Sequence, residues 1–168
     1  MGRGPGKRIA TPVFAKRSQS NLAGIVTMAT IKQPANPEAN SRVKAVFEDI
    51  RATRKTDFVN NLWRTLAFDP ALLESTWAEV KKLMATPTQL DPLTKEMIYI
   101  AVSIANSCSY CVHSHTAAAR AKGMTDPQYA ELLAIVSLAA KTNHLATGLQ
   151  VPVDEVFDAN TSSAHRHP

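Results

Sequence analysis

Apolar residues recur at three- and four-residue intervals along much of the chain, a spacing that is typical of amphipathic helices. The first such segment begins near residue 40 and runs to about residue 55, behind a capping Asn40 and Ser41. One side of it carries Val43, Val46, Phe47 and Ile50. The segment "FVNNLWRTLAF" predicts a short second helix. The ordered part of the chain therefore begins as one helix after another.

Asp-Pro pairs indicate three further helix starts, because aspartate caps a helix and proline is tolerated in its first turn: Asp69-Pro70, Asp91-Pro92 and Asp126-Pro127. The helix after Pro70 ends in "VKKLM", and the helix after Pro127 is expected to reach about Lys141. The segment after Pro92, "LTKEMIYIAVSIAN", is apolar nearly all round, which predicts a position inside a bundle.

A helix from Cys108 to Lys122, ended by Gly123, lies between the last two. "VPVDEVFDAN" near the C-terminus predicts at most one more short turn. No segment alternates between apolar and polar residues over the length of a strand. The sequence therefore predicts an all-α, single-domain helical bundle of about six helices, with a CxxC motif at the start of a helix.

Length and charge divide the 168 residues into one domain with two tails. Residues 1–27 carry five basic residues and no acid, whereas the remaining 14 basic residues balance the 14 acidic ones. The basic excess belongs to this segment, so the globular part gives no reason to expect nucleic acid as a partner. We expect a flexible basic extension over 1–39, a helical domain over 40–145, and a C-terminal segment with a polar tail over 146–168.

The N-terminal segment leaves two interpretations open. Its composition fits an organellar transit peptide, and it also fits an upstream extension of a protein that begins at Met28. Without import, we expect a cytoplasmic protein. No apolar run reaches the roughly 18 residues that span a bilayer, so no membrane association is expected. His165 and His167, in the polar tail, are expected to be solvated.

The chemistry-bearing stretch is "NSCSYCVHSH", residues 106–115. On a helix, Cys108, Cys111 and His115 fall within about 60° of one another and form one stripe. His113 falls on the opposite side. If Ser107 caps this helix, Cys108 takes the first helical position, where free amides and the helix dipole favour a thiolate. A thiolate with a second thiol three residues away can attack an O–O or S–S bond and then close a disulfide.

Glu96 is the only acid between residues 92 and 125. Along one straight helix it would lie about 18 Å from Cys108. A chain reversal near residue 107 would make the two helices antiparallel and bring Glu96 to the level of His115. A surface glutamate in a first helical turn is the alternative interpretation.

Four other kinds of site compete for the two cysteines. Covalent haem needs CxxCH, and Val112 occupies the position after Cys111. Structural zinc needs four ligands, and a second Cys or His pair is absent. A thioredoxin-like motif needs strands. Inert core thiols remain an alternative, and a redox-active pair on a helical scaffold is favoured.

The spacing E-x11-CxxC-x3-H, formed by Glu96, Cys108, Cys111 and His115 within residues 43–142, resembles the active-site motif of the AhpD-like alkylhydroperoxidases. These belong to the wider carboxymuconolactone decarboxylase superfamily. The resemblance implies an all-helical fold, assembly into a homotrimer or homohexamer, and active sites near subunit contacts.

The resemblance also implies roles. Cys111 would attack a hydroperoxide and Cys108 would resolve it as a disulfide, with Glu96 and His115 as a proton relay. A dithiol or a lipoylated protein would recycle the disulfide, and no cofactor, metal or haem would take part.

One residue departs from the best-known members of this family, which have a histidine before the second cysteine. This chain has Tyr110. A phenol with a pKa near 10 does not shuttle protons at neutral pH as imidazole does, so Tyr110 is a candidate for a supporting role only.

The sequence leaves three candidate functions. The favoured one is an alkylhydroperoxidase-like thiol peroxidase. A non-catalytic, redox-responsive oligomeric protein is the first alternative. A carboxymuconolactone-decarboxylase-type enzyme is the second, although that branch lacks the CxxC pair.

Overall fold

The computed structural model describes residues 29–157, and within this range the chain forms helices and loops without a strand. The α-helices are α1 (Ser41–Arg54), α2 (Asn61–Leu66), α3 (Pro70–Val80), α4 (Pro92–Ala105), α5 (Ser109–Ala121) and α6 (Asp126–Gly148). Shorter turns are the 3₁₀ helices η2 (Pro37–Ala39) and η4 (Glu155–Phe157) and the π-helical turn η3 (Lys81–Ala85). The prediction of an all-α fold with about six helices is confirmed. Residues 1–28, Met28 included, and the tail with His165 and His167 lie outside the described range.

The predicted helix starts are confirmed where a side chain caps the first turn. The Asn40 side chain accepts hydrogen bonds from the amides of Arg42 and Val43. Asp69 and Asp91 cap α3 and α4 in the same way. These caps satisfy amides that have no partner within the helix.

The last helix begins and ends differently from the sequence prediction. Thr125 caps α6 through a capping box with Gln128, so Asp126 is already helical. The helix continues past the expected end near Lys141 to Gly148. It therefore crosses the expected domain boundary at residue 145.

Residues just before α1 contact the helical domain, although the sequence placed them in the N-terminal extension. The Gln33 side chain donates to Thr65 Oγ1 at 2.9 Å, and Glu38 pairs with Arg51 at 2.7 Å. The packed part of the chain thus begins several residues before Asn40.

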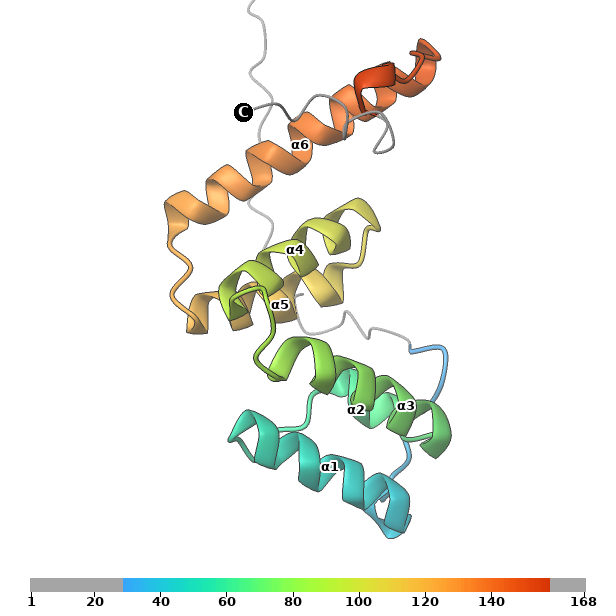
Figure 1. Cartoon of the computed structure of the whole chain (residues 1–168). Coiled ribbons are helices and arrows are strands. Elements are labelled where there is room, and N and C mark those ends of the chain that lie inside the picture. Colours follow the sequence, from blue (N-terminus) through green and yellow to red (C-terminus); the bar gives the residue numbers. More distant parts are fainter. Residues whose placement is uncertain (1–28, 158–168) are drawn as a thin grey trace, which may run out of the picture.

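Two apolar clusters hold the described part of the chain together. The N-terminal core, from α1 to α3, consists of Val43, Val46, Phe47, Ile50, Val59, Trp63, Ala67, Leu73 and Trp77. The C-terminal core, from α4 to α6, consists of Ile100, Ala119, Met124 and Leu132. In Figure 1, α4 and α5 lie between the α1–α3 layer and α6, which extends across the far side. The two cores are therefore stacked one above the other.

The prediction that α4 lies inside a bundle rather than on its surface is correct for only one side of the helix. Ile98 and Val102 are about half exposed, at 49% and 53% of their surface. The reason is that α5 and α6 cover only one side of α4, and its other side forms the wall of a cavity. In the described residues, no helix combines the length and apolar character that crossing a bilayer requires.

Candidate active site

The chain reverses direction between α4 and α5, and this reversal assembles the site. Ser107 adopts a left-handed backbone conformation with φ of 56°. The amide of Cys108 then donates to the carbonyl of Ser103 at 2.9 Å, which closes the C-terminus of α4. α5 runs back along α4, as the position of Glu96 relative to His115 predicts.

The prediction that Ser107 caps α5 is wrong. Ser107 is used for the left-handed turn, and Cys108 is itself the N-cap. The Cys108 sulfur accepts a hydrogen bond from the amide of Cys111 at 3.3 Å. The sulfur of Cys108, rather than a hydroxyl, thus satisfies a free amide at the start of the helix.

The environment gives the two cysteines different acidities. Hydrogen bonds donated by the side chain and the amide of Cys111 lower the pKa of Cys108. Burial, together with the hydrogen bond to Cys108, raises the pKa of Cys111 to about 11. In the reduced pair the negative charge therefore belongs on Cys108, with the Cys111 thiol as its donor. Both side chains are partly exposed and unbridged.

Glu96 and His115 are in direct contact, which the spacing made possible, so the alternative of a surface glutamate is wrong. His115 Nδ1 lies 2.6 Å from Glu96 Oε2, and the Glu96 side chain is only 7% exposed. The other oxygen of Glu96 accepts from Lys122 Nζ at 2.9 Å. Burial raises the pKa of Glu96, but the hydrogen bonds from His115 and Lys122 outweigh burial and hold this pKa below its usual value. Glu96 is thus an ionised acceptor that orients the imidazole.

Two residues in this cluster escaped the sequence prediction. Lys122 follows His115 by seven residues, so the same helical phase that placed His115 beside the cysteines puts Lys122 on that side too. The Tyr99 ring stacks on the His115 ring with 3.6 Å between centroids and 18° between planes. Tyr99 follows Glu96 by three residues on α4, which is the signal that could have identified it.

Tyr110 and His113 stand apart from this cluster. The Tyr110 hydroxyl accepts a hydrogen bond from the amide of Leu62 at 3.1 Å, and therefore joins α5 to the start of α2. His113 is exposed to solvent. Of the two histidines in the motif, only His115 contacts the buried glutamate.

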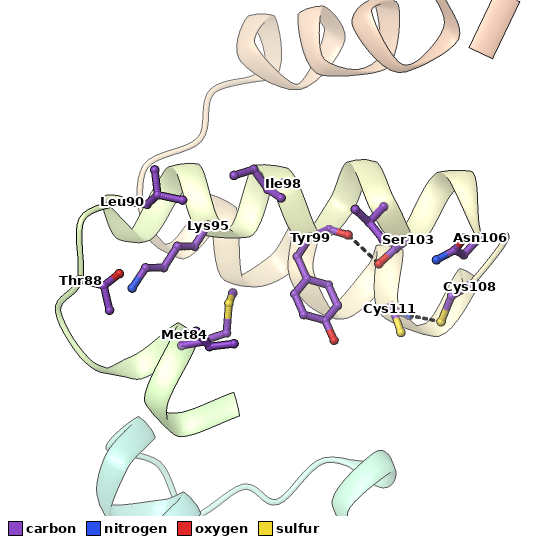
Figure 2. A pocket seen from close by; sticks show the side chains of 12 residues that line it. Met84, Thr88, Leu90, Lys95, Ile98, Tyr99, Ser103, Asn106, Cys108 and Cys111 are labelled. Atoms are coloured by element: carbon purple, nitrogen blue, oxygen red, sulfur yellow. Dashed lines mark hydrogen bonds between the residues drawn. The ribbon is translucent and has the colours of Figure 1, made fainter. Parts of the chain in front are cut away.

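A cavity of about 460 Å³ opens beside the thiols (Figure 2). Its lining is mostly apolar: Leu83, Met84, Thr88, Leu90, Lys95, Ile98, Tyr99, Val102, Ser103, Asn106, Cys108 and Cys111. In Figure 2, Lys95 and Thr88 lie at one end, both cysteines lie at the other, and Met84 and Tyr99 lie between them. Its volume is in the range of small-molecule sites.

Among residues 29–157, no three cysteine, histidine, aspartate or glutamate side chains gather as a metal site would need. The arrangement is that of a dithiol at the start of a helix, open to a cavity, together with a histidine held by a buried glutamate. These features define an all-α thiol protein of the AhpD type.

The chain belongs to the carboxymuconolactone decarboxylase family, whose pattern matches residues 70–154. The structure of the alkylhydroperoxidase AhpD core from Rhodospirillum rubrum is similar to this chain, with a TM-score of 0.75 and 64% sequence identity. The similarity covers 77% of this chain and 97% of that chain. No curated protein matches at a significant level. The family relationship supports a peroxidase-type function in broad terms.

Proposed function

We propose that this protein is a thiol-dependent peroxidase that reduces hydroperoxides through a Cys111/Cys108 dithiol–disulfide cycle, with Glu96 and His115 as the proton relay. The observation that carries this proposal is the 2.6 Å contact between His115 and the buried Glu96, on the two helices whose CxxC pair opens into a cavity. The kinship to AhpD-like proteins supports the same reaction.

In the proposed reaction, the Cys111 thiolate attacks the terminal oxygen of the hydroperoxide. The O–O bond breaks, an S–O bond forms, and the departing alkoxide takes a proton from His115 to become the alcohol. The Cys108 thiolate then attacks the Cys111 sulfenic acid, an S–S bond forms, and hydroxide leaves as water after protonation. Two thiols are oxidised to a disulfide as one hydroperoxide is reduced to an alcohol and water.

The acidities of the two cysteines favour the closing step of this cycle and oppose the first one. Because Cys108 has the lowered pKa, it is available as a thiolate for the closing step. Cys111 has a raised pKa, so its proton has to be removed before it attacks. Since Glu96 accepts from His115 Nδ1, the other ring nitrogen, Nε2, is the one left to exchange a proton in the proposed transfer. In the described residues no hydrogen bond joins His115 to either sulfur, so we assign this transfer to the complex with bound hydroperoxide.

The experiment is hydroperoxide consumption by the full chain with a dithiol reductant, comparing wild type with Cys111→Ser and Cys108→Ser. Cys111→Ser should abolish turnover. Cys108→Ser should still form a sulfenic acid on Cys111, detectable by trapping with dimedone, but should not turn over. Unchanged turnover in Cys111→Ser would contradict the proposal, and a sulfenic acid on Cys108 in Cys111→Ser would exchange the two roles.

We also propose a homotrimer or homohexamer that is recycled by a dithiol or a lipoylated protein. Support for self-association comes from α6, where apolar side chains remain exposed on the single chain: Ile135, Leu138 and Leu145. Light scattering on the purified protein tests the assembly. A monomer at micromolar concentration would contradict it.

A redox-responsive protein without significant turnover is the second candidate. The raised pKa of Cys111 favours this candidate, because little thiolate is present on that residue at neutral pH. The two functions differ in stoichiometry. A peroxidase consumes many equivalents of hydroperoxide when a dithiol is supplied, whereas a redox switch consumes one equivalent and stops.

A further inference from the structure

Lys95 is a buried cation without an anionic partner in the described part of the chain. The residue is 8% exposed, and it lines the cavity that also holds both cysteines. Its ammonium group donates to one backbone carbonyl, that of Thr86, at 3.0 Å. A buried ammonium is normally paired with a carboxylate, because its removal from water costs several kcal/mol.

The acids nearest to Lys95 in the sequence are engaged elsewhere. Asp91 uses its carboxylate to accept from the amides of Leu93 and Thr94 and from the Thr94 hydroxyl. Glu96 is held by His115 and Lys122. Lys95 also stands in the first turn of α4, where the helix dipole disfavours a cation. In the described residues, the Lys95 ammonium therefore has no carboxylate within ion-pair distance and lines the cavity with one hydrogen bond, to Thr86.

The rest of the cavity is mostly apolar, in contrast to the charged end at Lys95. Between Lys95 and the cysteines, Figure 2 shows Met84, Ile98 and Tyr99. Leu83 and Val102 also line the cavity, so most of its wall is apolar. A molecule that fits both features has a negatively charged group at one end and a hydrocarbon chain behind it. Amphipathic carboxylic acids have this form.

We propose that the cavity binds an amphipathic carboxylate, with its carboxylate on Lys95 and its hydrocarbon chain directed along the apolar wall towards Cys108 and Cys111. This inference rests on the proposed function where it names the substrate: a hydroperoxide of a fatty acid, whose carboxylate fixes the chain so that the O–O bond reaches the thiols. The reaction stays balanced as written above, and the product is the hydroxy acid.

The first test measures binding and needs no turnover. Decanoate and its uncharged methyl ester are titrated by calorimetry into the reduced full-length protein. Wild type should bind decanoate at least about tenfold more tightly than the ester, since a hydrogen bond to a charged group contributes on that order. Lys95→Met should remove this preference, and Lys95→Arg should keep part of it. Lys82→Met, which removes an exposed lysine of η3 outside the cavity lining, is the matched control and should bind as wild type does.

Three results would overturn the inference. Equal binding of acid and ester by wild type would mean that the cavity recognises hydrocarbon alone. Equal weakening of both ligands in Lys95→Met would mean that Lys95 only holds the loop at Thr86. Absence of decanoate binding by wild type would mean that the cavity is not a site for amphipathic carboxylates.

The second test separates this inference from the proposed function. Linoleic acid hydroperoxide and its methyl ester are compared as substrates, with the ratio of their kcat/KM values as the readout. Wild type should prefer the acid about tenfold through a lower KM, and Lys95→Met should bring the ratio close to one. Decanoate binding that depends on Lys95, without turnover of any hydroperoxide, would leave the carboxylate site standing and refute the peroxidase.

Discussion

The N-terminal and C-terminal cores are built from different kinds of residues. The N-terminal core buries large apolar side chains, including Trp63 and Trp77, whose rings meet edge to face with 5.3 Å between centroids. The C-terminal core is smaller, and α4 beside it carries the buried polar residues of the described chain: Lys95, Glu96 and Ser103. Apolar burial stabilises a fold, whereas buried charge opposes folding unless it is paired. We therefore expect the N-terminal core to contribute most of the stability. The C-terminal region holds the polar groups of the candidate site, and their burial lowers its contribution.

Removing a large side chain from the N-terminal core should have the largest effect on stability. Leu73 is fully buried, so Leu73→Ala should lower the free energy of unfolding by about 2–5 kcal/mol, measured by urea denaturation. Leu72, the adjacent residue on α3, is 44% exposed and provides the control. Leu72→Ala should change stability by less than about 1 kcal/mol. Equal effects from the two variants would mean that this core does not carry the stability assigned to it.

Removing the buried carboxylate of Glu96 beside the C-terminal core should have the next largest effect. Glu96→Gln removes the charged acceptor of two hydrogen bonds, from His115 and Lys122, so it should destabilise the protein by about 1–3 kcal/mol at neutral pH. Because the pKa of Glu96 is lowered on folding, its stabilising contribution is fully present above its ordinary value of 4.5. The contribution is lost as the pH falls through the lowered pKa.

Denaturation of wild type and Glu96→Gln across the acid range measures this dependence. The difference between the two should shrink as the solution becomes more acidic. Glu131→Gln, on the exposed side of α6, is the control and should match wild type at every pH. A difference that grows in acid would contradict the ionised state assigned to Glu96.

The two thiols should differ in reactivity by at least about tenfold. With the pKa of Cys111 at about 11 and that of Cys108 lowered, most of the thiolate at neutral pH is on Cys108. Brief treatment of the reduced protein with iodoacetamide should therefore modify Cys108 first, as read by peptide mass spectrometry. Unfolded protein is the control, since both cysteines should react equally there. Preferential modification of Cys111 in the folded protein would reverse the assignment.

Much of the fold could be predicted from the sequence because its signals are local. Helix starts follow from caps such as Asn40, Asp69 and Asp91, and the all-α class follows from the absence of two-residue alternation. The exposure of Ile98 and Val102 could not be predicted, because an apolar sequence does not tell which of its faces finds a partner. The length of α6 was underestimated for a related reason: its exposed second half shows no one-sided pattern.

The candidate site could also be predicted only in part from the sequence. Helical phase placed His115 with the cysteines and Glu96 within reach, and the structure brings Glu96 and His115 into contact. The unequal acidities of Cys108 and Cys111 depend on which sulfur is more buried and which one accepts hydrogen bonds. The cap at Cys108 depends on the backbone conformation of Ser107, which no residue type dictates. The pKa difference and the cap at Cys108 depend on the folded conformation of one turn, so the spacing of the residues in the sequence does not predict them.

The smallest expected effect concerns the hydrogen bond between the two regions. Asn60 stands at the cap position of α2, yet its side chain makes no capping hydrogen bond, and its Oδ1 is buried without a partner. The Tyr110 hydroxyl accepts from the Leu62 amide instead, so one of the two residues between the cysteines caps a helix of the N-terminal region.

Tyr110→Phe removes this acceptor and should destabilise the protein by about 1 kcal/mol, measured by thermal denaturation. Tyr129→Phe is the control, because the Tyr129 ring contact with Arg120 does not use a hydroxyl. If Tyr110 only supports the start of α2, the variant loses stability and keeps the alkylation preference for Cys108. If the variant also changes the alkylation preference, the hydrogen bond between Tyr110 and Leu62 affects the reactivity of the cysteines. The N-terminal region then influences the candidate site and does more than support it.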